Sequence, residues 1–205
     1  MTLELFGAAR SVFVRTTRLA LEEKGVPYRL IATAPHTPEI LAHNPFGKIP
    51  VMRHGDVVLF ESLSIIVYVD RVFDGPGLLP DDPQRAARTV QWASAINASV
   101  FPELVGYMQA NAFPSGRNGA REPAVIDSLV PRVKAQLAIL DAAVAETDHL
   151  VGDTFTPADM YLMPMLAYLR VFPESAVMLA ASANLSRYFE RHAARGSFRA
   201  TDPAR

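Results

Sequence analysis

The sequence has no cysteine among its 205 residues. That absence excludes disulfides, thiolate metal sites and any mechanism in which a protein thiol is the nucleophile. The five histidines form no pair with the spacing of metal ligands, such as HxxxH. We therefore expect no metal site in this protein.

A strong net charge and long apolar runs are also missing. The formal net charge of -1 gives no basic surface for nucleic acid or for an anionic membrane. No stretch approaches the roughly 20 apolar residues of a membrane-spanning helix, and the first residues carry no basic segment followed by an apolar signal core. We therefore expect a cytoplasmic protein without nucleic-acid or membrane partners. Its 50% apolar content predicts a packed core.

The first part of the chain shows the periodicity of a small α/β domain. Alternating apolar residues and turn signals predict strands, and apolar stripes at helical spacing predict helices. In chain order we expect strand 3–6, helix 11–24 ending at Gly25, strand 28–31, short helix 36–41, strands 49–52 and 56–60, and helix 61–73. This order predicts a mixed four-stranded sheet with a parallel first pair, covered by helices.

The second part of the chain is predicted to be all helical. Residues 75–83 are rich in glycine and proline, which is typical of a linker. We therefore divide the chain into residues 1–76, a linker 77–83, and a helical domain 84–205. Its helices are expected at 84–112, 123–146, 157–169 and 185–194, with Pro102 and Pro131 kinking or interrupting them. Residues 113–122 are the most loop-like part.

One motif places a proline at the start of a strand, in the sequence Asn-Pro-Phe-Gly-Lys-Ile-Pro at residues 44–50. Local sequence alone favours a trans bond before Pro50. A cis bond would instead turn the backbone N–H and C=O of Ile49 outward and offer a short strand edge to a peptide-like ligand.

A second motif, Phe-Glu-Ser-Leu-Ser-Ile at residues 60–65, joins the end of a strand to the start of a helix. The free N–H groups and the positive dipole end can bind an anion, and the Ser62 hydroxyl adds a donor. Glu61 can accept a hydrogen bond from an ammonium group, so an α-amino acid would satisfy both residues. Taken alone, however, the motif is better explained as an ordinary helix N-cap.

Together, these motifs resemble the glutathione S-transferase family. The resemblance covers essentially the whole chain and also includes Leu-Glu-Glu-Lys-Gly at residues 21–25 and Val-Gly-Asp-Thr-Phe-Thr-Pro-Ala-Asp at residues 151–159. The segment 188–203 is similar to the tail of bacterial members. The resemblance implies a thioredoxin-like N-terminal domain, an all-helical C-terminal domain, a homodimer, and glutathione as co-substrate.

The resemblance also implies roles for individual residues in binding glutathione. The backbone of Ile49, before a cis Pro50, would pair with the cysteinyl unit. Ser62 would bind the γ-glutamyl carboxylate and Glu61 the γ-glutamyl ammonium. The glycyl carboxylate would lie near Lys48, with His36 as a further basic residue for it, although a surface role explains His36 equally well.

Ser11 is the implied activator of the glutathione thiol. Family members use a tyrosine, a serine or a cysteine near the end of the first strand, and here Phe6 occupies the tyrosine position. Counted back from residues 21–25, Ser11 stands where serine-type classes such as phi, tau and approximately zeta carry their catalytic hydroxyl. Val12 and Phe13 follow it, where those classes often have small residues or proline. From local sequence, Ser11 is equally well explained as a helix N-cap.

An apolar pocket for the electrophile is implied between the two domains. The candidates to line it are Val12, Phe13, Phe101, Val105, Met108 and Tyr168, although such residues at helical spacing are more often plain core. The segment from Thr156 to Asp159 has the pattern of a capping box, and we interpret it as structural.

The implied function is conjugation of glutathione to hydrophobic electrophiles in detoxification, with hydroperoxide reduction as a possible extension. Two alternatives stay open at this point. One is a zeta-like isomerase or a dehalogenase that uses glutathione on a dedicated substrate. The other is a non-catalytic module of the same fold that binds ligands or partners.

Overall fold

The computed structural model describes residues 2–114 and 119–203. Its N-terminal part alternates strands and helices in the predicted order. The elements are β1 (Leu3–Phe6), α1 (Val12–Lys24), β2 (Tyr28–Ile31), α2 (Pro38–Leu41), β3 (Val51–His54), β4 (Val57–Phe60) and α3 (Ser62–Val72).

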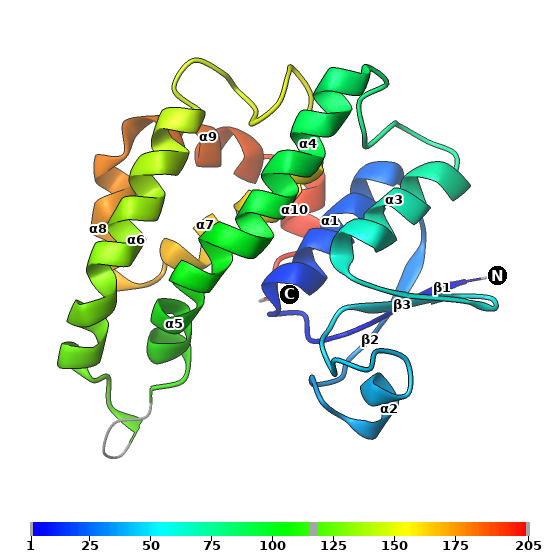
Figure 1. Ribbon diagram of the computed structural model, residues 1–205, viewed down its shortest axis with the longest axis horizontal. Coiled ribbons are helices and arrows are strands. Elements are labelled where there is room, and N and C mark those ends of the chain that lie inside the picture. Colours follow the sequence, from blue (N-terminus) through cyan, green and yellow to red (C-terminus); the bar gives the residue numbers. More distant parts are fainter. Residues whose placement is uncertain (1, 115–118, 204–205) are drawn as a thin grey trace.

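The rest of the described chain is helical (Figure 1). It consists of α4 (Pro83–Ala95), the π-helix η1 (Ile96–Val100), α5 (Phe101–Ala112), α6 (Pro123–Ala143), α7 (Pro157–Leu169), α8 (Pro173–Ala181), α9 (Ala183–Ala193) and α10 (Gly196–Ala200). The predicted fold class, a thioredoxin-like α/β domain followed by an all-helical domain, is confirmed.

The sheet has the strand order β2-β1-β3-β4. β1 pairs with β2 in parallel, whereas β3 lies antiparallel to both β1 and β4. α1 and α3 lie on one side of this sheet and α2 lies on the other (Figure 1). The alternation along β1 explains this layering, because Leu3 and Leu5 join the main core while Phe6 packs with Ile40 of α2.

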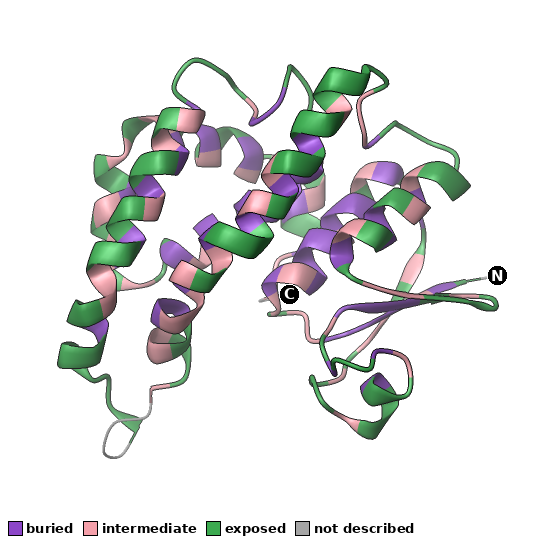
Figure 2. Cartoon of the chain, viewed as in Figure 1, coloured by how far each residue is buried: buried purple, intermediate pink, exposed green. Residues whose placement is uncertain are grey.

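The two domains share one hydrophobic core, which is centred where α1 packs on α7. Buried residues are concentrated in α1, β1 and α7, and α4 and α6 are exposed on their outer sides (Figure 2). The segment between the domains is fastened to this core. The Asp70 carboxylate accepts hydrogen bonds from Lys24 Nζ at 3.2 Å and from the backbone N–H of Leu78 at 2.7 Å.

The helical predictions are partly confirmed and partly wrong. The pattern 84–112 is interrupted near Pro102, as predicted, because the π-helix η1 separates α4 from α5. In contrast, α6 continues through Pro131, so the predicted interruption there is wrong. Two short helices, α8 and α10, were not predicted at all. Of the predicted loop 113–122, residues 115–118 lie outside the described residues.

None of the described helices has both the length and the apolar character needed to cross a membrane.

Candidate functional site

A cavity of about 180 Å³ opens where the sheet domain meets the helical domain. It is lined by Phe13, Asn44, Lys48, Ile49, Pro50, Glu61, Ser62 and Asn97. The structure therefore brings together both sequence motifs, at residues 44–50 and 60–65, with the first turn of α1. Asn97 is contributed by the helical domain, from the π-helix η1.

The first wall of the cavity is the turn that leads into β3. The Ile49-Pro50 peptide bond is cis, so the trans bond favoured by local sequence is wrong. Tertiary context decides this bond, and the turn is held by the buried side chain of Asn44. Its amide Nδ2 donates to the carbonyl of Lys48 at 2.9 Å, and its Oδ1 accepts from the N–H of Phe46 at 3.0 Å.

The opposite wall is the start of α3. Glu61 has φ 66° and ψ 114°, a conformation that side-chain-bearing residues rarely adopt, and its side chain makes no capping bond to the helix. The ordinary N-cap explanation therefore does not describe Glu61. Backbone strain of this kind often occurs at ligand sites, because binding geometry rather than stability sets the conformation. Ser62, the first helical residue, is only 5% exposed.

The Ser62 hydroxyl is held by a residue from the other domain. The hydroxyl of Tyr161, in α7, donates to Ser62 Oγ at 3.1 Å. Burial raises the pKa of Tyr161 to about 12, with the nearby charge of Glu61 acting in the same direction. Tyr161 therefore remains protonated and a donor at neutral pH.

Ser11 is the N-cap of α1. Its Oγ accepts a long hydrogen bond of 3.5 Å from the N–H of Val14, and its own N–H donates to the carbonyl of Ala8 at 2.9 Å. Ser11 is not among the residues that line the cavity, although Phe13, two residues further along, is. The cap uses the oxygen of Ser11 as an acceptor and leaves its hydroxyl proton available to another group.

His36 lies beside the turn that carries Lys48. The backbone N–H of His36 donates to the carbonyl of Gly47 at 2.7 Å. The His36 ring packs closely on Gly47, since a Cβ added there would lie only 2.2 Å from His36 Nδ1. Both His36 and Lys48 are exposed, and only Lys48 lines the cavity. The two basic side chains thus lie at the same end of the site.

The candidates for the electrophile pocket fall into two groups. Phe13 lines the cavity and meets Phe101 edge-on, with ring centroids 4.7 Å apart. Val12 and Met108 are buried in the main core, with 8% and 6% of their surface exposed, and Val105 packs against that core.

Tyr168 is the remaining candidate for the electrophile pocket. It stacks on Phe172, with ring centroids 6.4 Å apart, and its hydroxyl donates to the carbonyl of Arg10, next to Ser11. Tyr168 is thus close to the start of α1, outside the residues that line the cavity.

Sequence reasoning missed three residues of this site: Asn44, Asn97 and Tyr161. Asn44 stood inside a motif but was given no role. Asn97 lies in a segment whose periodicity is that of a continuous helix, so the sequence carries no visible sign of the π-turn. Tyr161 occurs among apolar residues of α7, a pattern typical of core.

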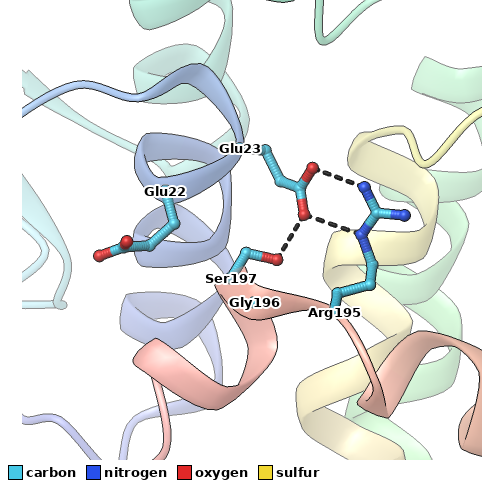
Figure 3. Close-up of a pocket in the computed structure, with 5 residues that line it drawn as sticks. All are labelled: Glu22, Glu23, Arg195, Gly196 and Ser197. Carbon is cyan, nitrogen blue, oxygen red and sulfur yellow. Dashed lines mark hydrogen bonds and ion pairs between the residues drawn. The ribbon is translucent and has the colours of Figure 1, made fainter.

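A larger depression of about 370 Å³ lies elsewhere, between α1 and the start of α10. Figure 3 shows its walls paired with one another: the Glu23 carboxylate accepts from Arg195 Nε at 2.8 Å and Nη2 at 2.6 Å, and from the Ser197 hydroxyl. Burial acts to raise the pKa of Glu23, but these bonds outweigh it and the pKa lies below its usual value. These hydrogen bonds hold the C-terminal segment against α1.

Among the described residues, no group of three or more His, Cys, Asp or Glu side chains could hold a metal ion. The polar groups of the candidate site are instead a serine, a glutamate, a lysine, two asparagines and backbone groups.

Fold and site together define a class of protein. A thioredoxin-like domain presents a cis-proline edge and a helix N-terminus to one cavity, which an all-helical domain closes. Residues 10–72 match the family described as "Glutathione S-transferase, N-terminal domain", and residues 104–196 match "Glutathione S-transferase, C-terminal domain".

Individual relatives agree with this match. The chain is 31% identical to glutathione S-transferase 4 of Zea mays, over 94% of this chain and 88% of the relative. The structure superimposes on glutathione transferase F7 from Populus trichocarpa with a TM-score of 0.87 and 25% identity, covering 98% of this chain and 97% of that one. A glutathione-bound transferase from Methylobacillus flagellatus gives a TM-score of 0.79 at 25% identity, covering 98% of each chain. The chain therefore belongs to the glutathione S-transferase family, and glutathione S-transferases of the plants Zea mays and Arabidopsis thaliana are among its sequence relatives.

Proposed function

We propose that this protein is a glutathione S-transferase that binds glutathione in the cavity of about 180 Å³ and transfers its sulfur to hydrophobic electrophiles. One observation carries the proposal: the cis-proline edge at Ile49 and the Glu61-Ser62 start of α3 open into the same cavity. A tripeptide with a charged group at each end matches such a site, because one edge can pair with its backbone while the helix start binds one end.

Each end of glutathione then has a chemically suitable partner. The γ-glutamyl carboxylate is bound by the Ser62 hydroxyl at the positive end of the α3 dipole, and the γ-glutamyl ammonium by the Glu61 carboxylate. The backbone of Ile49 pairs with the cysteinyl unit. The glycyl carboxylate lies near Lys48, with His36 beside it, because a lysine point charge suits a carboxylate.

The thiol is activated by Ser11 in this proposal. A thiol of pKa about 8.5 is mostly protonated at neutral pH, and lowering that value by two units requires roughly 2.7 kcal/mol of preferential thiolate stabilisation. The Ser11 hydroxyl donates to the sulfur, with the N-terminus of α1 beneath it. Because Ser11 accepts only a long bond from Val14 N–H, capping and sulfur stabilisation are compatible.

The electrophile is expected to lie against the aromatic pair formed by Phe13 and Phe101, beside the cavity. Tyr168 and Val105 are proposed to extend this apolar surface, and the buried side chains of Val12 and Met108 support it from behind. The thiolate attacks an electrophilic carbon or a hydroperoxide oxygen. The leaving group departs with the bonding electron pair.

The family likeness also supports a homodimer that acts in detoxification. A cytoplasmic location is part of the same proposal. Size-exclusion chromatography with light scattering tests this proposal, because a homodimer should have twice the chain mass of 22.4 kDa.

A glutathione titration by calorimetry tests the proposed function, followed by a turnover panel of aryl halides, epoxides and hydroperoxides. We expect binding at micromolar to millimolar glutathione, turnover with at least one electrophile class, and weaker binding in Ser62→Ala. Wild-type protein that binds no glutathione at millimolar concentration would contradict the proposal.

A further inference from the structure

Tyr161 is the one described residue of α7 whose side chain hydrogen-bonds to Ser62 across the domain boundary. It is 2% exposed, and its ring lies 5.9 Å from that of Phe13. The glutathione site described so far belongs almost entirely to the sheet domain, so a buried contact from the helical domain to a binding residue needs an explanation.

The direction of the hydrogen bond is the important feature. A serine hydroxyl has one proton to donate and two lone pairs, and a tyrosine hydroxyl likewise has a single proton. The Tyr161 hydroxyl donates to Ser62 Oγ at 3.1 Å. Ser62 Oγ therefore accepts a hydrogen bond from Tyr161, and the Ser62 hydroxyl proton is available to a third group.

Ser62 also lines the cavity, so its hydroxyl can donate a hydrogen bond to a group bound there. A buried hydroxyl without a fixed partner can rotate and present either a lone pair or its proton. With Tyr161 occupying one lone pair, the orientations in which Ser62 donates to a carboxylate in the cavity are favoured. Hydrogen bonds that polarise one another in this way also strengthen the terminal donor.

We propose that Tyr161 is a positioning residue of the glutathione site, which orients the Ser62 hydroxyl to donate to the γ-glutamyl carboxylate. This inference rests on the proposed function, because it assumes that glutathione occupies the cavity. It extends that function by giving the helical domain a part in recognising glutathione as well as the electrophile. Correct docking of α7 on the sheet domain is then a condition for tight glutathione binding.

The test compares wild type with Tyr161→Phe, which keeps the ring beside Phe13 and removes only the hydroxyl. We expect the dissociation constant and the KM for glutathione to rise about 2- to 12-fold, the range of one hydrogen bond between uncharged groups. The kcat at saturating glutathione and the KM for the electrophile should change less than about twofold, since Tyr161 does not touch the reacting sulfur.

Tyr107→Phe is the matched control. Tyr107 is another buried tyrosine of the helical domain, and its hydroxyl bonds to Ser175 at 3.2 Å. Its loss should reduce stability and leave the dissociation constant for glutathione unchanged. An equal loss of glutathione affinity in both variants would show a merely structural effect and overturn the proposal.

Two further measurements test whether the effect of Tyr161 depends on the γ-glutamyl carboxylate and on Ser62. γ-Aminobutyryl-cysteinyl-glycine lacks only the γ-glutamyl carboxylate, so wild type and Tyr161→Phe should bind it equally. In Ser62→Ala, adding Tyr161→Phe should cause no further loss of glutathione affinity, because Tyr161 acts through Ser62. Additive losses, or equal weakening of both ligands by Tyr161→Phe, would overturn the inference. If wild type binds no glutathione, the proposed function fails first and the inference fails with it.

Discussion

At the scale of single residues, the site is formed by groups whose conformations are set by their neighbours rather than by local preference. Glu61 keeps a positive φ that glycine would adopt more readily, and Ser62 is buried with its hydroxyl oxygen accepting from Tyr161. Ser11 combines a capping position with a free hydroxyl proton. Glu61 thus departs from its local preference, whereas Ser11 caps α1 as the local sequence predicts, and all three residues are proposed to contact glutathione.

Substitutions of Glu61 test whether its strained backbone lowers stability while its carboxylate binds glutathione. Glu61→Gly removes the backbone strain, whereas Glu61→Gln removes only the charge, so we expect Glu61→Gly to be more stable than Glu61→Gln by about 1 kcal/mol. Both variants should bind glutathione about 5- to 10-fold more weakly, because the γ-glutamyl ammonium loses its anionic partner. Thermal denaturation and calorimetry measure the two effects. A stable Glu61→Gly that binds glutathione normally would remove Glu61 from the site.

At the scale of secondary-structure elements, the capping box of α7 is also an anchor for distant segments. The fully buried Asp159 carboxylate accepts hydrogen bonds from Thr156 N–H at 2.8 Å and from Thr156 Oγ1 at 3.1 Å. It also accepts from Leu150 N–H at 2.8 Å and from the Tyr188 hydroxyl at 2.7 Å. The box therefore connects α7 to the preceding loop and to α9.

This connection predicts unequal effects of two substitutions. Thr156→Ala should reduce the free energy of unfolding by about 1 kcal/mol, the usual loss for an N-cap. Asp159→Ala should cost about 3 kcal/mol, because it leaves several buried donors without an acceptor. Chemical denaturation measures both, and glutathione turnover in the folded variants should stay close to wild type. A large loss of turnover in a variant that remains folded would give this segment a catalytic role.

Local patterns predicted the regular elements well and the tertiary choices poorly. α1 begins after Ser11 and ends before Gly25, as expected, and the parallel pairing of β1 with β2 follows from the predicted β-α-β order. The cis bond before Pro50 depends on groups such as Asn44 that hold the turn, so local sequence could not decide it. The five-residue α10 is likewise stabilised from a distance, because Arg195 and Ser197 at its start bind Glu23 of α1.

At the scale of the whole molecule, the site depends on two domains that share a core. α1 packs on α7, and the C-terminal segment returns to α1, where Arg15 Nη2 donates to the carbonyl of Phe198 at 3.1 Å. Because this packing holds the helical domain against the sheet domain, Asn97 lines the cavity and Tyr161 reaches Ser62. We therefore expect stability and glutathione binding to be linked.

His192 of α9 and His149 of the loop before α7 form a pair that predicts how stability depends on pH. His192 Nε2 donates to the carbonyl of Asp148 at 2.8 Å, and its buried Nδ1 has no hydrogen-bond partner among the described residues. Burial lowers the pKa of His192 below 6.5; the Asp148 carbonyl and the charge of Asp159 oppose this shift, and His149 and Arg195 add to it. Protonation is therefore more costly in the folded state than in the unfolded state.

The sign of the effect follows from that difference. A histidine whose pKa is lowered by folding contributes stability that is complete above its unfolded pKa and is lost as the pH falls from there through its folded pKa. We expect the free energy of unfolding to decrease as the pH is lowered from 7 to 5, and His192→Gln to reduce this dependence. His43→Gln serves as the control. Denaturation curves that keep the same pH dependence in His192→Gln would contradict the assignment.

The central claim is that Ser11 stabilises the thiolate of glutathione bound in the cavity. Its most direct test is the ultraviolet absorbance of the thiolate, followed against pH in the glutathione complexes of wild type and Ser11→Ala. We predict a bound-thiol pKa about two units below the ordinary 8.5 in wild type and a return close to that value in Ser11→Ala. The same thiolate fraction in both complexes at neutral pH would contradict the account.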